Sequence, residues 1–154
     1  MMEFSSKHYN LIDIIEKDFK IDFYGIHGIG HWKRVFKNTL ILSDYYNVKS
    51  DVFELFALLH DSKREDDLID IEHGYRASIF VQKLLNEQII TLNDEDAQKL
   101  IYVCKNHTKT DTTDPLYSDI VVKICFDSDR LDIGRVGVVP NPSYMATDYA
   151  KSLL

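Results

Sequence analysis

His60 and Asp61 directly follow the apolar run LFALL at 55–59. A histidine and a carboxylate at the end of a buried segment are costly unless they are paired or bind a cation. Alone, the pair is best explained by helix capping. However, His31 opens an earlier amphipathic segment, and Asp129 lies in FDSDRLD on a later apolar one. Together they form a mixed nitrogen and oxygen ligand set that suits Mn²⁺, Fe²⁺ or Zn²⁺ and leaves positions for water or substrate.

The last carboxylate of this set has three candidates, Asp127, Asp129 and Asp132. Residues two apart on a helix point about 200° away from each other. Asp127 and Asp129 therefore cannot both reach one ion, and the spacing alone leaves the choice open.

The ordered motifs HWKRV (31–35), LLHD (58–61) and SDRLD (128–132) resemble the H…HD…D signature of the HD-domain phosphohydrolase superfamily. The resemblance covers residues 27–135. It implies a helical bundle whose metal ligands are His31, His60, Asp61 and Asp129. Ser128-Asp129 matches the family's Ala-Asp pattern, which favours Asp129 and keeps Asp127 in reserve.

His73 and His107 lie on two further segments. Alone, each would be interpreted as a surface or core histidine. A subset of HD proteins, similar to bacterial dinucleoside-tetraphosphate hydrolases, uses such histidines to hold a second ion, with the aspartate of the HD pair as a bridge. The sequence HDSKRED at 60–66 departs from the pattern of that subset. The resemblance thus implies one or two divalent ions, of Mn, Fe, Zn, Co, Ni or Mg.

The implied function is a metal-dependent phosphohydrolase that acts on a small phosphorylated molecule, such as a nucleotide or dinucleoside polyphosphate, by metal-activated attack of water on phosphorus. Lys63 and Arg64 follow the ligand pair and are predicted to contact phosphate and assist catalysis, unless they only form a solvated charged loop. Arg34, one turn after His31, is predicted to bind substrate or to pair with an aspartate. The alternatives are a non-catalytic module that binds a nucleotide or regulates a partner and, ranked lower, a di-iron oxygenase.

The elements that must position these residues read as helices. Only six glycines and three prolines interrupt a chain that is 45% apolar and 28% charged. We therefore expect one all-α domain over residues 1–154, a bundle of six to seven helices around a buried metal site. The central helix is predicted at about 52–60, started by a capping box of Asp51 and Glu54. Ser143 is predicted to cap a last short helix, and the stretch from Arg135 to Tyr149 to form a rim or lid.

The net charge and the two cysteines indicate which partners and which compartment to expect. The net charge of −7 disfavours a nucleic-acid polymer as partner, because phosphates require an excess of lysine and arginine. Cys104 and Cys125 lie on apolar segments and are expected to be reduced core thiols. Neither a signal peptide nor a membrane span is expected from the sequence. We therefore predict a cytoplasmic protein with no membrane partner. A homodimer is compatible with the sequence.

Overall fold

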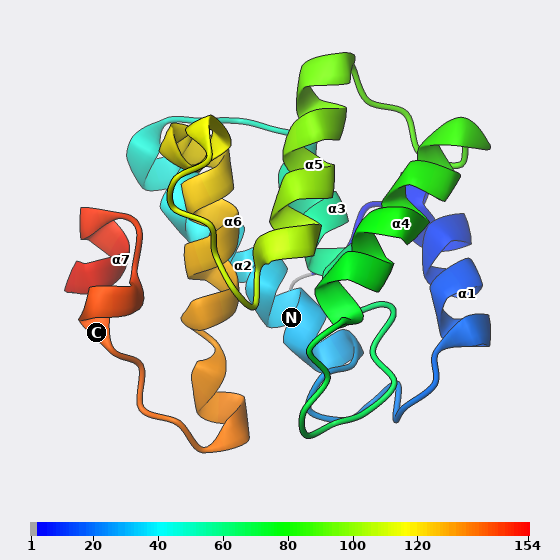
Figure 1. The fold of residues 1–154 in the computed structure, drawn as a ribbon, viewed down its shortest axis with the longest axis horizontal. Helices are drawn as coiled ribbons and strands as arrows, with labels where there is room; N and C mark the ends of the chain where they lie inside the picture. The colour runs from blue at the N-terminus through cyan, green and yellow to red at the C-terminus, as the bar shows by residue number, and fades with distance from the viewer. Residues whose placement is uncertain (1–2) are drawn as a thin grey trace.

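The computed structural model describes residues 3–154, which form a bundle of α-helices joined by loops and 3₁₀ turns (Figure 1). The seven α-helices in this range are α1 (Tyr9–Asp18), α2 (Ile29–Tyr46), α3 (Val52–Leu59), α4 (His73–Asn86), α5 (Asp94–Asn106), α6 (Ile120–Arg130) and α7 (Asp148–Ser152). The 3₁₀ turns are η1 (Ser6–His8), η2 (Pro115–Ser118), η3 (Ile133–Val136) and η4 (Pro142–Tyr144). Residues 3–154 contain no strand, so the predicted all-α bundle is confirmed. Met1 and Met2 of the predicted domain lie outside the described residues.

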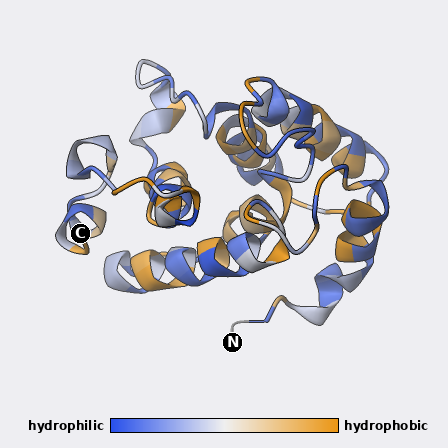
Figure 2. Cartoon of the chain, turned by 90° about the horizontal axis from the view of Figure 1, so that it is seen from below, coloured by the Kyte–Doolittle hydropathy of each residue, from blue (hydrophilic) through white to orange (hydrophobic). Residues whose placement is uncertain are grey.

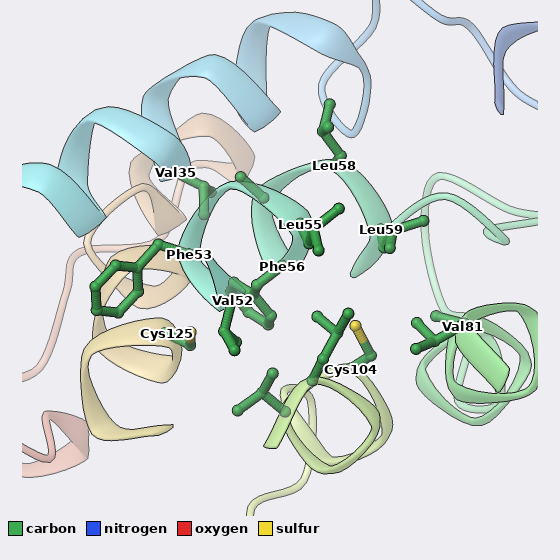
Figure 3. Close-up of a cluster of buried hydrophobic side chains, with 14 of the residues drawn as sticks. Val35, Val52, Phe53, Leu55, Phe56, Leu58, Leu59, Val81, Cys104 and Cys125 are labelled. Atoms are coloured by element: carbon green, nitrogen blue, oxygen red, sulfur yellow. The ribbon is translucent and has the colours of Figure 1, made fainter. Parts of the chain in front are cut away.

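The central helix of the bundle is α3, whose eight residues are all buried. Figure 3 shows Phe56 and its neighbours on α3 among Val35 of α2, Val81 of α4, Cys104 of α5 and Cys125 of α6. Each fully buried aliphatic or aromatic side chain stabilises the fold by about 1.5–3 kcal/mol. Because α3 is packed on all sides, its C-terminal end has a fixed position. His60 and Asp61 directly follow that end.

The longest helix, α2, buries one face and exposes the other. The buried residues recur every three or four positions, and apolar and polar residues alternate along the helices in Figure 2. They include Trp32, Val35, Thr39 and Leu42. A side chain at Gly28, the residue before α2, would lie 1.9 Å from the carbonyl oxygen of Phe23, so the chain turns into α2 at a position where only glycine fits. Among residues 3–154, none of the helices has both the length and the apolar character needed to cross a membrane.

A second close approach fixes α4 against α5. A Cβ at Gly74 would lie 2.8 Å from the carbonyl oxygen of Lys105 and 2.9 Å from that of Cys104. Because the glycine has no side chain, the start of α4 packs directly on the end of α5. This contact brings His73, next to Gly74, close to His107, which follows α5.

The predicted capping box at α3 is wrong. Asp51 makes no side-chain cap bond to the helix. The Glu54 carboxylate accepts hydrogen bonds instead from the backbone N–H of Ser5 at 2.5 Å and from its hydroxyl at 2.8 Å. The acidic residue in the first turn therefore fastens the N-terminal segment to the core rather than capping its own helix.

The last helix also begins later than predicted. Ser143 lies in η4, and both its N–H and its hydroxyl donate to the side chain of Asn141. Thr147 caps α7, because its hydroxyl accepts the N–H of Ala150. Pro142 at the first position of η4 suits a short turn, and the chain then runs extended through Met145 before α7 starts.

Candidate metal centre

Four of the six predicted metal ligands lie at helix ends that meet near the centre of the bundle. His31 is in the first turn of α2, and Asp129 is in the last turn of α6. His60 and Asp61 directly follow α3, against which both α2 and α6 pack. The helix packing therefore brings together residues that are up to 98 positions apart in the sequence.

His31, His60 and Asp129 form the first cluster. The Nε2 atoms of the two histidines are 3.0 Å apart. The Oδ1 atom of Asp129 lies 3.2 Å from the Nε2 atom of His31 and 3.5 Å from that of His60. The Oδ2 atom of Asp61 is also 3.5 Å from each of these nitrogens.

Asp61, His73 and His107 form the second cluster. The Oδ1 atom of Asp61 lies 3.0 Å from the Nε2 atom of His73 and 3.4 Å from that of His107. The two histidine nitrogens are 2.9 Å apart. One carboxylate thus faces both clusters, with one oxygen toward each.

The hydrogen bonds of the histidines determine which ring nitrogen carries the proton. The Nδ1 atoms of three of them lie at carbonyl oxygens: Phe56 for His60 at 3.0 Å, Asp70 for His73 at 2.5 Å and Cys104 for His107 at 2.7 Å. A carbonyl oxygen can only accept, so each Nδ1 donates, and in the neutral ring Nε2 then presents a lone pair. The Nδ1 atom of His31 donates in the same way to the carboxylate of Asp132 at 2.7 Å. In each cluster two Nε2 lone pairs therefore face each other and a carboxylate.

Lone pairs at such distances repel unless a cation lies between them. Donor atoms bound to one ion at about 2.0–2.2 Å lie roughly 3.0–3.5 Å from their neighbours, which matches the spacing in both clusters. Moreover, Asp61 Oδ2 and Asp129 Oδ1 are buried without a hydrogen-bond partner among residues 3–154. The residues present therefore fit a divalent ion with mixed imidazole and carboxylate ligands.

The ionisation of the site shows how strongly its carboxylates attract positive charge. Burial raises the pKa of Asp61 and of Asp129, yet the facing histidines hold both pKa values well below the usual range. Burial lowers the pKa of His60, but the charges of Asp61 and Asp129 outweigh it and raise this pKa. Burial lowers the pKa of His107 and keeps its imidazole neutral, as a metal ligand requires. The carboxylates thus stay ionised and attract positive charge to the space between the rings.

A cavity of about 240 Å³ opens beside the two clusters. Asp61, Asp129, His73 and His107 form part of its wall. Three arginines, Arg64, Arg130 and Arg135, form another part. The cavity therefore joins acidic and imidazole ligands to a concentration of guanidinium groups, although the chain as a whole carries a net charge of −7.

Asp127, the reserve candidate for the last ligand, points away from both clusters. Its carboxylate accepts the N–H of Ala146 at 2.6 Å and the N–H and hydroxyl of Thr147 at 2.8 and 2.7 Å. Burial raises the pKa of Asp127 despite these hydrogen bonds. Of the three candidates for the last ligand, only Asp129 faces the Nε2 atoms of His31 and His60, because Asp132 contacts the Nδ1 atom of His31 instead.

Two predicted substrate contacts are not brought to the cavity. The Lys63 ammonium lies 4.1 Å from the centre of the Phe80 ring and does not line the cavity with Arg64. Arg34 donates from Nε to the two carboxylate oxygens of Asp132, at 2.8 and 3.0 Å, which is the aspartate pairing that the sequence left open. Of the three predicted phosphate-binding residues, only Arg64 lies at the site.

Sequence reasoning gave too little weight to three residues near the clusters. Asp132 orients His31, Arg135 lines the cavity 3.8 Å from Asp129 Oδ1, and His27 places Nδ1 3.5 Å from Asp61 Oδ2. The available signals were the aspartate three residues after Asp129, the arginine three residues later and the glycine-rich loop that carries His27.

Comparison with known proteins tests the fold. No protein-family model matches the chain, and no curated protein matches it. A crystal structure of a protein from an uncultured Thermotogales bacterium, described as a predicted HD superfamily hydrolase, is similar to this chain at 24% sequence identity and a TM-score of 0.68. The similarity covers 95% of this chain and 82% of that one. The chain therefore has the fold of an HD-superfamily protein.

Proposed function

We propose that this protein is a metal-dependent phosphohydrolase that acts on a small phosphorylated substrate. The observation that carries the proposal is the carboxylate of Asp61, which faces two histidine clusters beside a cavity lined by three arginines. The similar protein is described as a predicted HD superfamily hydrolase, and this description supports hydrolysis as the class of reaction.

In this proposal the first cluster, with Asp61, holds one divalent ion, and the second cluster holds another. Divalent ions at such sites lower the pKa of a bound water and stabilise the charge of a phosphoryl group. The chain fixes the ligands beforehand, because each imidazole is oriented by a carbonyl or carboxylate at its Nδ1 atom.

The guanidinium groups would bind the phosphoryl oxygens. The Nε atom of Arg64 lies 3.5 Å from Asp61 Oδ1, and the Nη2 atom of Arg135 lies 3.8 Å from Asp129 Oδ1. Both arginines therefore flank the carboxylates that would hold the ions. Guanidinium groups bind phosphate in two-point contacts and remain charged at any physiological pH. A cavity of about 240 Å³ has room for a phosphoryl group.

The test is phosphate release by protein loaded with Mn²⁺, measured on phosphate esters and nucleotides. We expect Arg64→Ala to lower kcat/KM at least tenfold, because it removes a cation from the cavity wall. Lys63→Ala is the matched control, since it removes a neighbouring positive charge that lies outside the cavity, and it should change kcat/KM less than about threefold.

His60→Ala should abolish turnover and reduce the bound metal, measured by elemental analysis. Unchanged metal content in His60→Ala would remove the proposed site. Oxygen consumption by iron-loaded protein without phosphate release would support the oxygenase instead, and nucleotide binding without either reaction would support a binding module.

A further inference from the structure

Two further cavities lie where α1 meets α4 and the loop after Asp61. The larger, of about 490 Å³, lies between α1 and α4, which are neighbours at the right of Figure 1. The smaller, of about 320 Å³, lies between the end of α1, the loop and the start of α4. Three residues, Asp18, Lys63 and Arg76, line both cavities. A single ligand can therefore extend from one cavity into the other.

The larger cavity, called the apolar cavity below, is walled mainly by aliphatic and aromatic side chains. These are Ile14, Tyr75, Ile79, Phe80, Leu84 and Ile89. Of the described residues that line it, Tyr75 alone has an uncharged polar side chain. Lys83 and Glu87, its charged residues away from the smaller cavity, have opposite signs and lie one helical turn apart. Polar groups of a ligand would find few partners here, so the lining suits a hydrocarbon chain.

The smaller cavity, called the basic cavity below, has an excess of positive charge, although the whole chain has a net charge of −7. Its charged lining consists of four cationic side chains, Lys20, Lys63, Arg64 and Arg76, and two anionic ones, Asp18 and Glu65. The Glu65 carboxylate is already paired, since it lies 2.6 Å from the Nζ atom of Lys20 and 3.7 Å from the Nη1 atom of Arg76. Because the excess is small, it suits a ligand with one negative charge better than one with two.

Lys63 lies at the boundary between the two cavities. Its ammonium is 4.1 Å from the centre of the Phe80 ring, which belongs to the apolar cavity. Its carbonyl accepts the Nε–H of Arg76 at 3.1 Å, and Arg76 donates in turn to both carboxylate oxygens of Asp70, at 2.6 and 2.7 Å. Among residues 3–154, the Lys63 ammonium makes no ion pair. The loop thus presents a cation at a fixed place where it is available to an anionic group.

We propose that the two cavities form one binding site for a medium-chain carboxylate, with its hydrocarbon chain in the apolar cavity and its carboxylate beside Lys63 in the basic cavity. Transfer of the chain from water to apolar surface favours binding. The carboxylate forms charge-assisted hydrogen bonds with ammonium and guanidinium groups. A cationic amphiphile would meet like charges, and an anion without a chain would leave the apolar cavity unfilled.

Arg64 couples this site to the metal cavity, because it lines both the metal cavity and the basic cavity. Its Nε atom is buried and has no hydrogen-bond partner among residues 3–154. A carboxylate bound in the basic cavity would attract this guanidinium and weaken its contact with a phosphoryl group on the other side. This coupling rests on the proposed function, and it makes the carboxylate an inhibitor that raises KM.

The experiment measures decanoate binding by isothermal titration calorimetry to wild type and to Ile79→Glu, which places a carboxylate in the wall of the apolar cavity. Ile41→Glu is the matched control, because Ile41 lies on α2 outside both cavities and is 40% exposed, compared with 46% for Ile79. We expect Ile79→Glu to lower the affinity at least about tenfold and Ile41→Glu less than about twofold. Octanoate should bind wild type about tenfold more weakly than decanoate, because it buries two fewer CH₂ groups.

Lys63→Gln tests the charged end of the site. Its control is Lys37→Gln, which removes an exposed lysine of α2 outside both cavities. Lys63→Gln should weaken decanoate binding at least about fivefold and Lys37→Gln less than about twofold. Decyltrimethylammonium, which has the same chain and the opposite charge, should not bind. Equal binding of this cation, or equal affinity of wild type and Ile79→Glu for decanoate, would overturn the inference. Tighter binding of decyl phosphate than of decanoate would overturn the assignment of a carboxylate.

Calorimetry does not depend on hydrolysis, so the binding site and the proposed function can fail separately. With Mn²⁺-loaded protein, decanoate should raise KM for phenyl phosphate in wild type and Ile41→Glu and leave it unchanged in Ile79→Glu. Decanoate that binds wild type without raising KM would overturn the coupling through Arg64. Decanoate binding without any phosphate release would support the site and contradict the proposed function alone.

Discussion

Asp132→Asn tests whether the hydrogen bond to His31 prepares the metal centre. Asp132 is 14% exposed, accepts from His31 Nδ1 at 2.7 Å and makes no predicted contact with a metal ion. Asparagine keeps an oxygen acceptor in the same place but removes the negative charge that makes His31 a better ligand. Loss of such an outer carboxylate lowers metal affinity about 10–100-fold, or roughly 1.4–2.7 kcal/mol.

The assay is competition for Zn²⁺ between the protein and a colorimetric chelator, with thermal unfolding measured in parallel. Arg34→Gln is the control: it removes the other partner of Asp132, but its side chain is 50% exposed and its charge is screened by solvent. We expect Arg34→Gln to change the affinity less than about threefold. If Asp132→Asn bound Zn²⁺ within twofold of wild type while folding normally, the orienting role assigned to Asp132 would be refuted.

Three further predictions concern separate parts of the molecule. His107→Ala should lower the metal content from two ions to one per chain by elemental analysis, because the first cluster keeps all its ligands; two ions in this variant would contradict the second site. Arg135→Ala should lower kcat/KM for a phosphate ester about 10–100-fold, and an unchanged value would remove Arg135 from the phosphate contacts. Glu54→Gln should destabilise the fold by about 1–2 kcal/mol at pH 7 in urea titrations. Burial raises the pKa of Glu54, but the contacts with His8 and Ser5 outweigh it and hold the pKa below 4.5, so the stabilisation by the carboxylate is present above that pH and is lost as the pH falls through the folded-state value. A difference between wild type and Glu54→Gln that stayed constant down to pH 3 would contradict this assignment.

The helices were predictable because they follow from local patterns, and the clustered histidines were predictable because the ordered motifs resemble those of a known family. Helical periodicity identified the buried face of α2, and the apolar run before His60 identified α3 as central. Ordered motifs then indicated which residues share a site, although His73 and His107 carried little signal alone. The structure brings all six predicted ligands into the two clusters, and metal binding by them stays a prediction.

Contacts between side chains far apart in the sequence were not predictable from spacing. Lys63 and Arg64 are adjacent in a loop without periodicity, so nothing in the sequence showed that one packs on Phe80 while the other lines the cavity. The pairing of Arg34 with Asp132 spans 98 residues. Likewise, the partners of Asp127 lie about twenty residues further along, which left it indistinguishable from a ligand.

The placement of Asp127 and Asp129 on one turn of α6 has a consequence for how such a protein can change. The Asp129 carboxylate faces the histidines of the first cluster, and the Asp127 carboxylate accepts hydrogen bonds from Ala146 and Thr147, which follow a mostly exposed segment. Replacing residues 136–144, which are mostly exposed, would leave all six residues of the two clusters in place. Under the proposed function, substitutions in this short stretch would change the surroundings of the metal centre while the residues of both clusters stay the same.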